Sequence, residues 1–176
     1  MSYVRFGAMI VTATIVMYGL MYLNTYALDH VWFSETRAYM AIVMGATMAV
    51  IMLGFMLSMY DRRGVNLAIL AGSIVVFALA LWLVRSQQTV DQVSYMKAMI
   101  PHHSIAIMTS RRAHIKDPRV RELADGIIIA QEKEIAEMER LIADLERNPA
   151  PQDAPDLPPG ARQAPAALEK APAGGS

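Results

Sequence analysis

The stretch Tyr39–Tyr60, YMAIVMGATMAVIMLGFMLSMY, decides the fold class, because it carries no charged residue over a length that can cross a lipid bilayer. An α-helix rises about 1.5 Å per residue, so a hydrocarbon core about 30 Å thick needs roughly 20 apolar residues. Two further runs, Phe6–Leu28 and Leu67–Val84, meet the same requirement. We therefore expect three membrane helices within a membrane domain that spans residues 1–86.

The composition divides the chain into an apolar part and an aqueous part. Hydrophobic residues make up 55% of the chain and charged residues 18%, and most of the charges lie after residue 85. This asymmetry argues against one globular core. The 16 Lys and Arg balance the 16 Asp and Glu, so membrane lipid is an expected partner and nucleic acid is not. The absence of Cys excludes disulfides, thiolate metal sites and Cys nucleophiles.

The basic residues predict the orientation of the membrane domain. The short loop between the second and third spans holds Arg62 and Arg63, whereas the loop before the second span holds Arg37 together with Asp29 and Glu35. By the positive-inside rule, the Arg62–Arg63 loop is cytoplasmic. We expect a multi-pass protein of the inner (plasma) membrane, with a cytoplasmic N-terminus and a periplasmic or otherwise extracytoplasmic C-terminal part.

Methionines form a stripe along the second span, in steps of four residues: Met40, Met44, Met48, Met52 and Met56. Beside this stripe lie Ala41, Gly45 and Ala49, small residues that suit close helix packing. The stripe is either a ladder of thioethers that passes Cu(I) or Ag(I), or a set of adaptable side chains that fill gaps between helices. We favour gap filling.

A helical hairpin follows the membrane domain, and we place it at residues 87–147. Its first helix runs from Thr89 to about Ile115, with Pro101 as its only helix breaker. Asp117 and Pro118 are typical of an N-cap and a first helical position, so they predict the start of a second helix. That helix ends at about residue 147, before Asn148 and Pro149.

The rest of the chain, residues 148–176, is rich in Pro and Ala and holds seven of the nine prolines. Such a composition cannot build a core, so it predicts a disordered tail. The expected fold is therefore all-α: three membrane helices, an extracytoplasmic hairpin and a tail.

The second hairpin helix has an apolar face whose residues recur at steps of three and four: Val120, Leu123, Ile127, Met138, Leu141, Ile142 and Leu145. Two helices of this length bury too little surface to be stable alone, so the hairpin must pack on a second copy, a partner or the membrane part. Two hairpins side by side would form a four-helix bundle. We therefore expect a homodimer or a higher oligomer.

The stretch Met96–His103, MKAMIPHH, carries the candidate chemistry. Counted at about 100° per residue, the apolar face of the first hairpin helix contains Met96, Met99, Ile100, His103 and Ile107, with His102 to one side. The apolar face of the second helix contains Gln131, Glu134 and Met138. Polar side chains in an apolar face are costly unless they find partners.

Folding the hairpin at about Lys116 predicts which residues meet: His103 with Gln131, Met99 with Glu134, and Met96 with Met138. Imidazole and thioether groups form a ligand set that suits copper, above all Cu(I). Glu134 or Gln131 could ligate the ion, or could accept the second ring N–H of a histidine. His30, in the loop before Trp32, is expected to be isolated.

A plainer interpretation is that His103 is a core histidine, hydrogen-bonded to Gln131 or Glu134, which holds the hairpin in register. For a lone histidine this interpretation would be preferred. The adjacent His102 and the nearby methionines make the two interpretations about equally favoured.

Two blocks of sequence resemble a known bacterial family. Met99-Ile100-Pro101-His102-His103, followed by Ala106-Ile107-Met108, is similar to its first block, and Ile128-Ile129-Ala130-Gln131-x-x-Glu134-Ile135-x-x-Met138 is similar to its second. The family is domain of unknown function 305, ferritin-like helical domains with copper-associated members. The resemblance covers about Val93–Leu145, and the three membrane spans lie outside it. It implies half of a ferritin-like bundle, an extracytoplasmic setting, and metal ligands drawn from Met96, Met99, His102, His103, Met108 and Met138. Ser104 stands where the family often has Gln or Glu.

The leading hypothesis is a membrane-anchored, extracytoplasmic copper-binding protein that acts in metal tolerance or delivery, together with copper-handling partner proteins. The alternative is a non-catalytic module for oligomerisation or partner docking, in which the His pair is structural. An enzyme is not expected. Di-iron bundles need several Glu and Glu-x-x-His motifs, and here only Glu134 faces inward and no Glu-x-x-His occurs.

Overall fold

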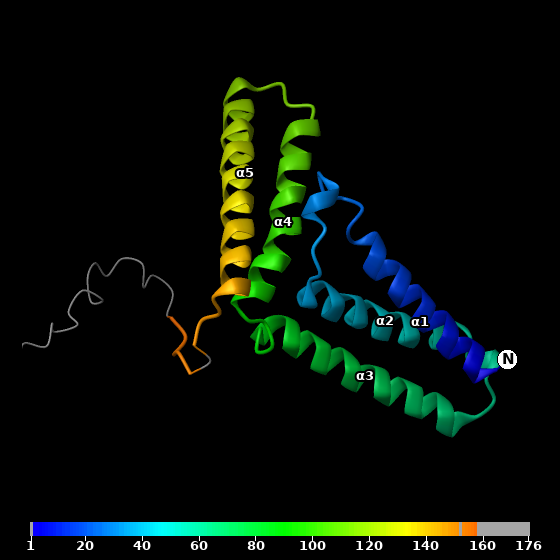
Figure 1. Cartoon of the computed structure of the whole chain (residues 1–176). Helices are drawn as coiled ribbons and strands as arrows, with labels where there is room; N and C mark the ends of the chain where they lie inside the picture. The colour runs from blue at the N-terminus through cyan, green and yellow to red at the C-terminus, as the bar shows by residue number, and fades with distance from the viewer. Residues whose placement is uncertain (1, 152, 158–176) are drawn as a thin grey trace, which may run out of the picture.

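The structure, a computed structural model, describes residues 2–151 and 153–157. All regular structure in these residues is helical, as the sequence predicts (Figure 1). The elements in chain order are α1 (Tyr3–Leu20), the 3-10 turn η1 (Leu28–His30), α2 (Glu35–Phe55), the 3-10 turn η2 (Leu57–Met59), α3 (Arg63–Ser86), α4 (Gln92–Arg112) and α5 (Pro118–Arg147).

Helices α1, α2 and α3 are long and apolar enough to cross a membrane, with mean hydropathies of 1.5, 2.0 and 2.7. Helix α2 packs against both α1 and α3. Most boundaries differ from the prediction by a few residues: α2 ends at Phe55 rather than at residue 60, α3 runs from Arg63 to Ser86 rather than from residue 67 to 84, and α4 ends at Arg112 rather than at about residue 115. Two of the differences have a clear local cause. Helix α1 ends at Leu20 rather than at residue 28, and the Thr25 hydroxyl donates a hydrogen bond to the Tyr22 carbonyl in the turn that follows. Helix α2 begins four residues early, because the Ser34 side chain caps it by accepting from the Arg37 N–H at 3.2 Å.

The small residues of α2 allow the close helix packing that the sequence predicts. Ala41, Gly45 and Ala49 are all buried. A side chain at Gly45 would collide with Thr14 of α1. The methionines of the stripe are all partly buried, and Met52 and Met56 pack against a cluster of Phe6, Ala49, Leu53 and Tyr60. This packing is what the gap-filling interpretation requires.

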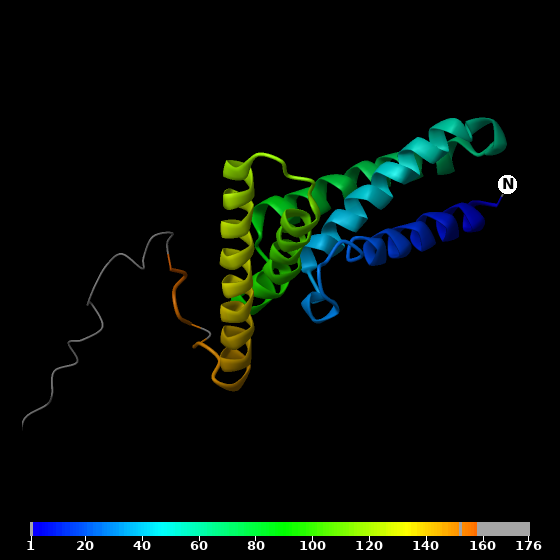
Figure 2. The ribbon, with the colours of Figure 1, turned by 90° about the horizontal axis from the view of Figure 1, so that it is seen from above.

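Helices α4 and α5 form the predicted hairpin, which lies across the ends of the three apolar helices with α5 outermost (Figures 1 and 2). Asp91 caps α4 by accepting from the Ser94 N–H at 2.7 Å, and Asp117 caps α5 by accepting from the Arg119 N–H at 2.9 Å. Pro101 is buried inside α4 without ending the helix.

The hairpin core holds only part of the apolar face that the sequence predicts. Buried Met96, Ile100, Ile107, Ile135 and Ile142 form the core, with Met138 and Leu145 packed against it. Four other predicted core positions are exposed, and their exposed fractions are 49% for Val120, 66% for Leu123, 37% for Ile127 and 40% for Leu141. The prediction fails at these positions because a single helix, α4, covers only one side of α5.

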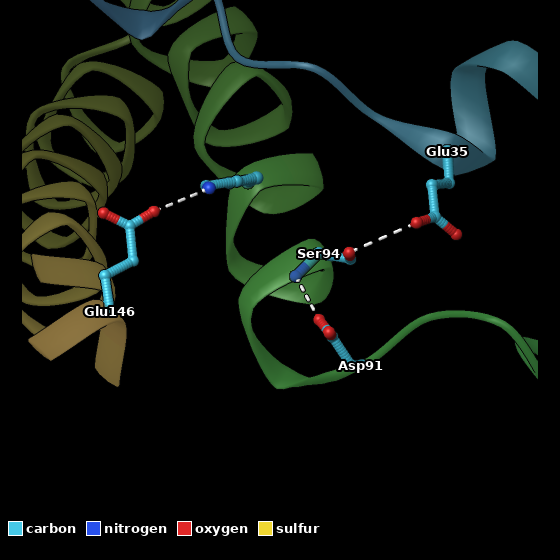
Figure 3. Close-up of polar contacts among 5 residues, drawn as sticks. Glu35, Asp91, Ser94 and Glu146 are labelled. Atoms are coloured by element: carbon cyan, nitrogen blue, oxygen red, sulfur yellow. Dashed lines mark hydrogen bonds and ion pairs between the residues drawn. The ribbon is translucent and has the colours of Figure 1, made fainter. Parts of the chain in front are cut away.

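The loop between α1 and α2 covers one side of the hairpin. Trp32 of this loop packs against the hairpin core, and Lys97 Nζ lies 5.6 Å from the centroid of the Trp32 ring. Ser94 of α4 donates to Glu35 of α2 at 3.3 Å, and on the side of α4 that faces α5, Lys97 forms an ion pair with Glu146, 2.8 Å long (Figure 3). The hairpin therefore packs on the part of the chain that holds the apolar helices. Of the predicted disordered tail, residue 152 and residues 158–176 lie outside the described residues.

Candidate metal site on the helical hairpin

His103 of α4 and Glu134 of α5 meet across the hairpin. His103 Nδ1 lies 3.0 Å from Glu134 Oε2, and the two side chains are 14% and 51% exposed. The distance is short enough for a hydrogen bond, yet Nδ1 is a buried polar atom without a hydrogen-bond partner. Since such atoms are rare in native proteins, His103 has capacity for a further partner, which a metal ion could fill.

The electrostatic surroundings keep the His103 ring neutral. Burial lowers the pKa of the imidazole below its ordinary value, and the neighbouring His102 acts in the same direction. The negative charge of Glu134 opposes this shift but does not outweigh burial. A neutral imidazole is the form that binds metal ions, so His103 is ready to ligate near neutral pH without first losing a proton.

Gln131 completes a small polar group with these two residues. Its Nε2 donates to Glu134 Oε2 at 3.2 Å. The same carboxylate oxygen therefore faces both the amide and the imidazole, and this arrangement orients Glu134 toward His103. The polar residues of the two apolar faces do converge, as the sequence predicts.

The register of the convergence differs from the prediction by about one helical turn. His103 was expected beside Gln131, but it contacts Glu134. The predicted register assumed a tight fold at Lys116 with both helices at the same level. Instead, residues 113–117 form an open link, and α5 begins beyond the end of α4 (Figure 1). The residue of α5 at the level of His103 is therefore further along the chain.

The observed register brings Met99 and Met138 to one level. Met99 lies one turn before His103, and Met138 one turn after Glu134. Because the helices are antiparallel, both methionines lie on the same side of the His103–Glu134 contact, about 6 Å along the helix axis. Both are partly buried. These four residues form the compact candidate site: Met99, His103, Glu134 and Met138.

Three other predicted ligands lie apart from this group. His102 is exposed, and its ring centroid is 6.2 Å from that of His103. Met108 is five residues from His103, so it lies about 140° around the helix on another face. Met96 is two turns away, about 10 Å along the axis, inside the hydrophobic core. Within residues 2–151 and 153–157, no three His, Asp or Glu side chains are grouped closely enough to hold a metal ion.

The expectation that His30 is isolated is wrong. Its Nδ1 lies 2.9 Å from the hydroxyl of Ser104, which is fully buried and also accepts a hydrogen bond from the Tyr26 N–H at 2.7 Å. Arg111 adds a contact by donating to the Tyr26 hydroxyl at 3.0 Å. Ser104 therefore anchors α4 to the loop before α2. The only sequence signal was a serine within a helix face of buried residues, and its partners are 74 and 78 residues away.

Comparison with known families identifies the hairpin. Residues 87–173 match the family described as Domain of unknown function (DUF305). This part of the chain belongs to that family. The DUF305 domain contains α4, α5 and the whole candidate site, and α1, α2 and α3 lie outside it.

The chain is also similar to a viral protein, "Uncharacterized protein L153" of Acanthamoeba polyphaga mimivirus. The two are 36% identical over 98 residues, which cover 52% of this chain and 64% of the viral protein. The match thus spans less than two thirds of the relative's length. No solved structure is significantly similar to this chain.

Proposed function

We propose that this protein is a membrane-anchored metal-binding protein whose DUF305 domain binds copper as Cu(I). The observation that carries the proposal is the His103–Glu134 contact, in which a neutral, partly buried imidazole has a ring nitrogen without a hydrogen-bond partner. Met99 and Met138 lie one turn away and supply thioether sulfur.

The ligand types favour copper over zinc or iron. Thioether sulfur and imidazole nitrogen suit Cu(I), whereas di-iron sites of helical bundles use several Glu carboxylates and two His. In the described residues one chain brings together only one His and one carboxylate at this site. Cu(I) tolerates such a small ligand set, and Met99 and Met138 would supply its thioether ligands.

The carboxylate has a role whether or not it ligates. If Cu(I) binds His103 through the unpartnered Nδ1, Glu134 beside it can ligate the same ion; if the ion binds through Nε2 instead, a small rotation of the ring lets Glu134 accept the Nδ1 proton and fix the tautomer. Gln131 holds the Glu134 oxygen in place for this task. The protein would bind and orient the ion without catalysis.

The three apolar helices bear on where in the cell the metal-binding hairpin lies. The three apolar helices support a multi-pass anchor, and the Arg62–Arg63 loop supports a cytoplasmic placement of the end opposite the hairpin. The hairpin would then be extracytoplasmic, in the periplasm of a cell with two membranes. There it would capture copper for tolerance or for delivery to copper-handling partners.

The test is a titration of the full chain in detergent micelles with Cu(I), in competition with a chromophoric chelator. We expect His103→Ala to abolish tight binding and Glu134→Gln to weaken it about 10- to 100-fold, the usual effect of losing an orienting partner. The matched control is His114→Ala, because His114 is exposed in the link between the hairpin helices.

Circular dichroism of each variant must show unchanged helicity. Equal binding by the wild type and by His103→Ala would sink the proposal. The remaining interpretation would then be structural, with the His103–Glu134 contact serving to hold α4 and α5 in register.

A further inference from the structure

One side of the hairpin is open, and the candidate site lies on it. We call this side the open flank. It consists of Met99, His103 and Ala106 of α4 together with Val120, Leu123, Ile127, Ala130, Glu134 and Leu141 of α5. The His103–Glu134 contact shows that the α4 and α5 residues lie on the same side, and steps of three, four and seven keep the other members beside them.

The opposite side of the hairpin is covered by the chain itself. There Tyr26, Ala27 and His30 lie against α5, around a cavity of about 310 Å³ whose other walls include Glu132 and Glu139. Within residues 2–151 and 153–157 the hairpin is thus packed on one flank and bare on the other, and the bare flank carries the apolar side chains.

The surface at the centre of the open flank is shaped to receive another helix. A groove of about 520 Å³ runs along α5 beside Leu123, Gly126, Ile127 and Ala130. Gly126 is exposed in the middle of a helix, and a Cβ there would meet nothing within 4 Å. A glycine inside a helix is destabilising relative to Ala, and nothing in the described part of the chain requires it. The close approach of a second helix backbone would require a glycine at this position.

The charged residues beside this groove are complementary to the same residues of a second copy of the chain. Glu122 lines the groove, and Lys133 lies one turn beyond Ala130 at its end; neither has a polar partner in the described part of the chain. An antiparallel pairing of two α5 helices about a two-fold axis at Ile127 sets Glu122 of each copy within one residue of the level of Lys133 of the other. The same axis brings Ile127, 37% exposed, against Ile127 of the partner.

The position of the hairpin allows this pairing between two chains in one membrane. Helix α5 lies across the ends of the apolar helices, with α4 between them (Figures 1 and 2). The open flank therefore faces sideways, parallel to the membrane surface. A two-fold axis along the membrane normal runs perpendicular to α5 and pairs two α5 helices antiparallel, as an isologous interface requires.

We propose that a second copy of this chain docks on the open flank, with α5 antiparallel to α5 about an axis at Ile127. In this arrangement the first turns of the partner's α5 cover the His103–Glu134 contact and exclude water from it. That last statement rests on the proposed copper site, whereas the docking itself does not.

The experiment uses the full chain in native-like membranes. Because the chain has no Cys, Ile127→Cys introduces a single thiol at the proposed axis. We expect diamide to convert this variant into a disulfide-linked dimer. The control is Ile129→Cys, because Ile129 is 68% exposed but lies about 200° around α5, and it should remain monomeric on a non-reducing gel.

A charge exchange tests the register independently. Lys133→Glu should weaken dimers of the detergent-solubilised chain roughly tenfold, the effect of about 1.4 kcal/mol, as measured by mass photometry over a dilution series. The double variant Glu122→Lys, Lys133→Glu should restore them. Equal cross-linking at residues 127 and 129, or a monomeric wild type, would overturn the proposal.

Copper titration of Ile127→Arg separates the two proposals. A monomeric variant that binds Cu(I) as tightly as the wild type would leave the copper site standing and refute its completion by a second chain. Weaker binding by the monomer, with Ile129→Arg unchanged, supports completion. Failure of His103→Ala to alter copper binding bears on the proposed function alone.

Discussion

Replacing Ser104 by Ala should detach α4 from the loop before α2. The Ser104 side chain is fully buried, and its oxygen accepts from the Tyr26 N–H at 2.7 Å and contacts His30 Nδ1 at 2.9 Å. The substitution removes both contacts and leaves the Tyr26 amide without its partner.

The free energy that the docked state loses in Ser104→Ala follows from these two contacts. An ordinary hydrogen bond contributes about 1 kcal/mol net, and a buried donor left without a partner costs about 1–3 kcal/mol. The docked state should therefore lose about 2–4 kcal/mol relative to the undocked one. Since 1.4 kcal/mol is a factor of ten, even about 2 kcal/mol raises the undocked population roughly 30-fold.

Hydrogen exchange of the Tyr26 amide measures this population directly, because exchange requires the contact to open. We expect the protection of that amide to fall at least tenfold in Ser104→Ala, while amides in the middle of α2 stay unchanged. Ser110→Ala is the matched control, since Ser110 lies on the same helix and is partly buried, and surface substitutions usually change stability by less than about 0.5 kcal/mol. A Tyr26 amide as protected in the variant as in the wild type would refute the anchoring role of Ser104.

Three further perturbations test other parts of the fold. Gly45→Val should destabilise the α1–α2 pair by about 1–3 kcal/mol through overpacking against Thr14. Gly54→Val is the control and should not destabilise it, because a Cβ at Gly54 would meet nothing within 4 Å. Thermal unfolding in detergent compares the two variants. Asp117→Ala removes the N-cap of α5 and should cost about 0.5–2 kcal/mol by the same assay. The pKa of His103 is lowered by folding, so the unfolded chain takes up the proton first as the pH falls. Stability should be fully present above pH of about 6.5, the ordinary histidine value, and should decline below it. His103→Gln should flatten this decline, and an unchanged pH profile would contradict it.

The sequence by itself determined the class of fold and most of its elements. Charge-free runs of membrane length predict α1, α2 and α3, because a helix is the simplest structure that satisfies its own backbone hydrogen bonds in a bilayer. Asp117 and Pro118 predict the start of α5 to the residue, because capping depends only on neighbours in the chain. The blocks around His103 and Glu134 predict that these residues converge, because helical periodicity places each on an inner face.

Only the tertiary structure decided how those faces meet. The open link at residues 113–117 shifts the register by about a turn, so His103 contacts Glu134 rather than Gln131. The anchoring of Ser104 by Tyr26 and His30 depends on partners more than 70 residues away, which no local pattern encodes. The exposure of Leu123 and Ile127 likewise follows from what packs beside α5. Periodicity shows that a face is apolar, but only the arrangement of neighbouring elements determines whether that face is covered within the chain or left for a second one.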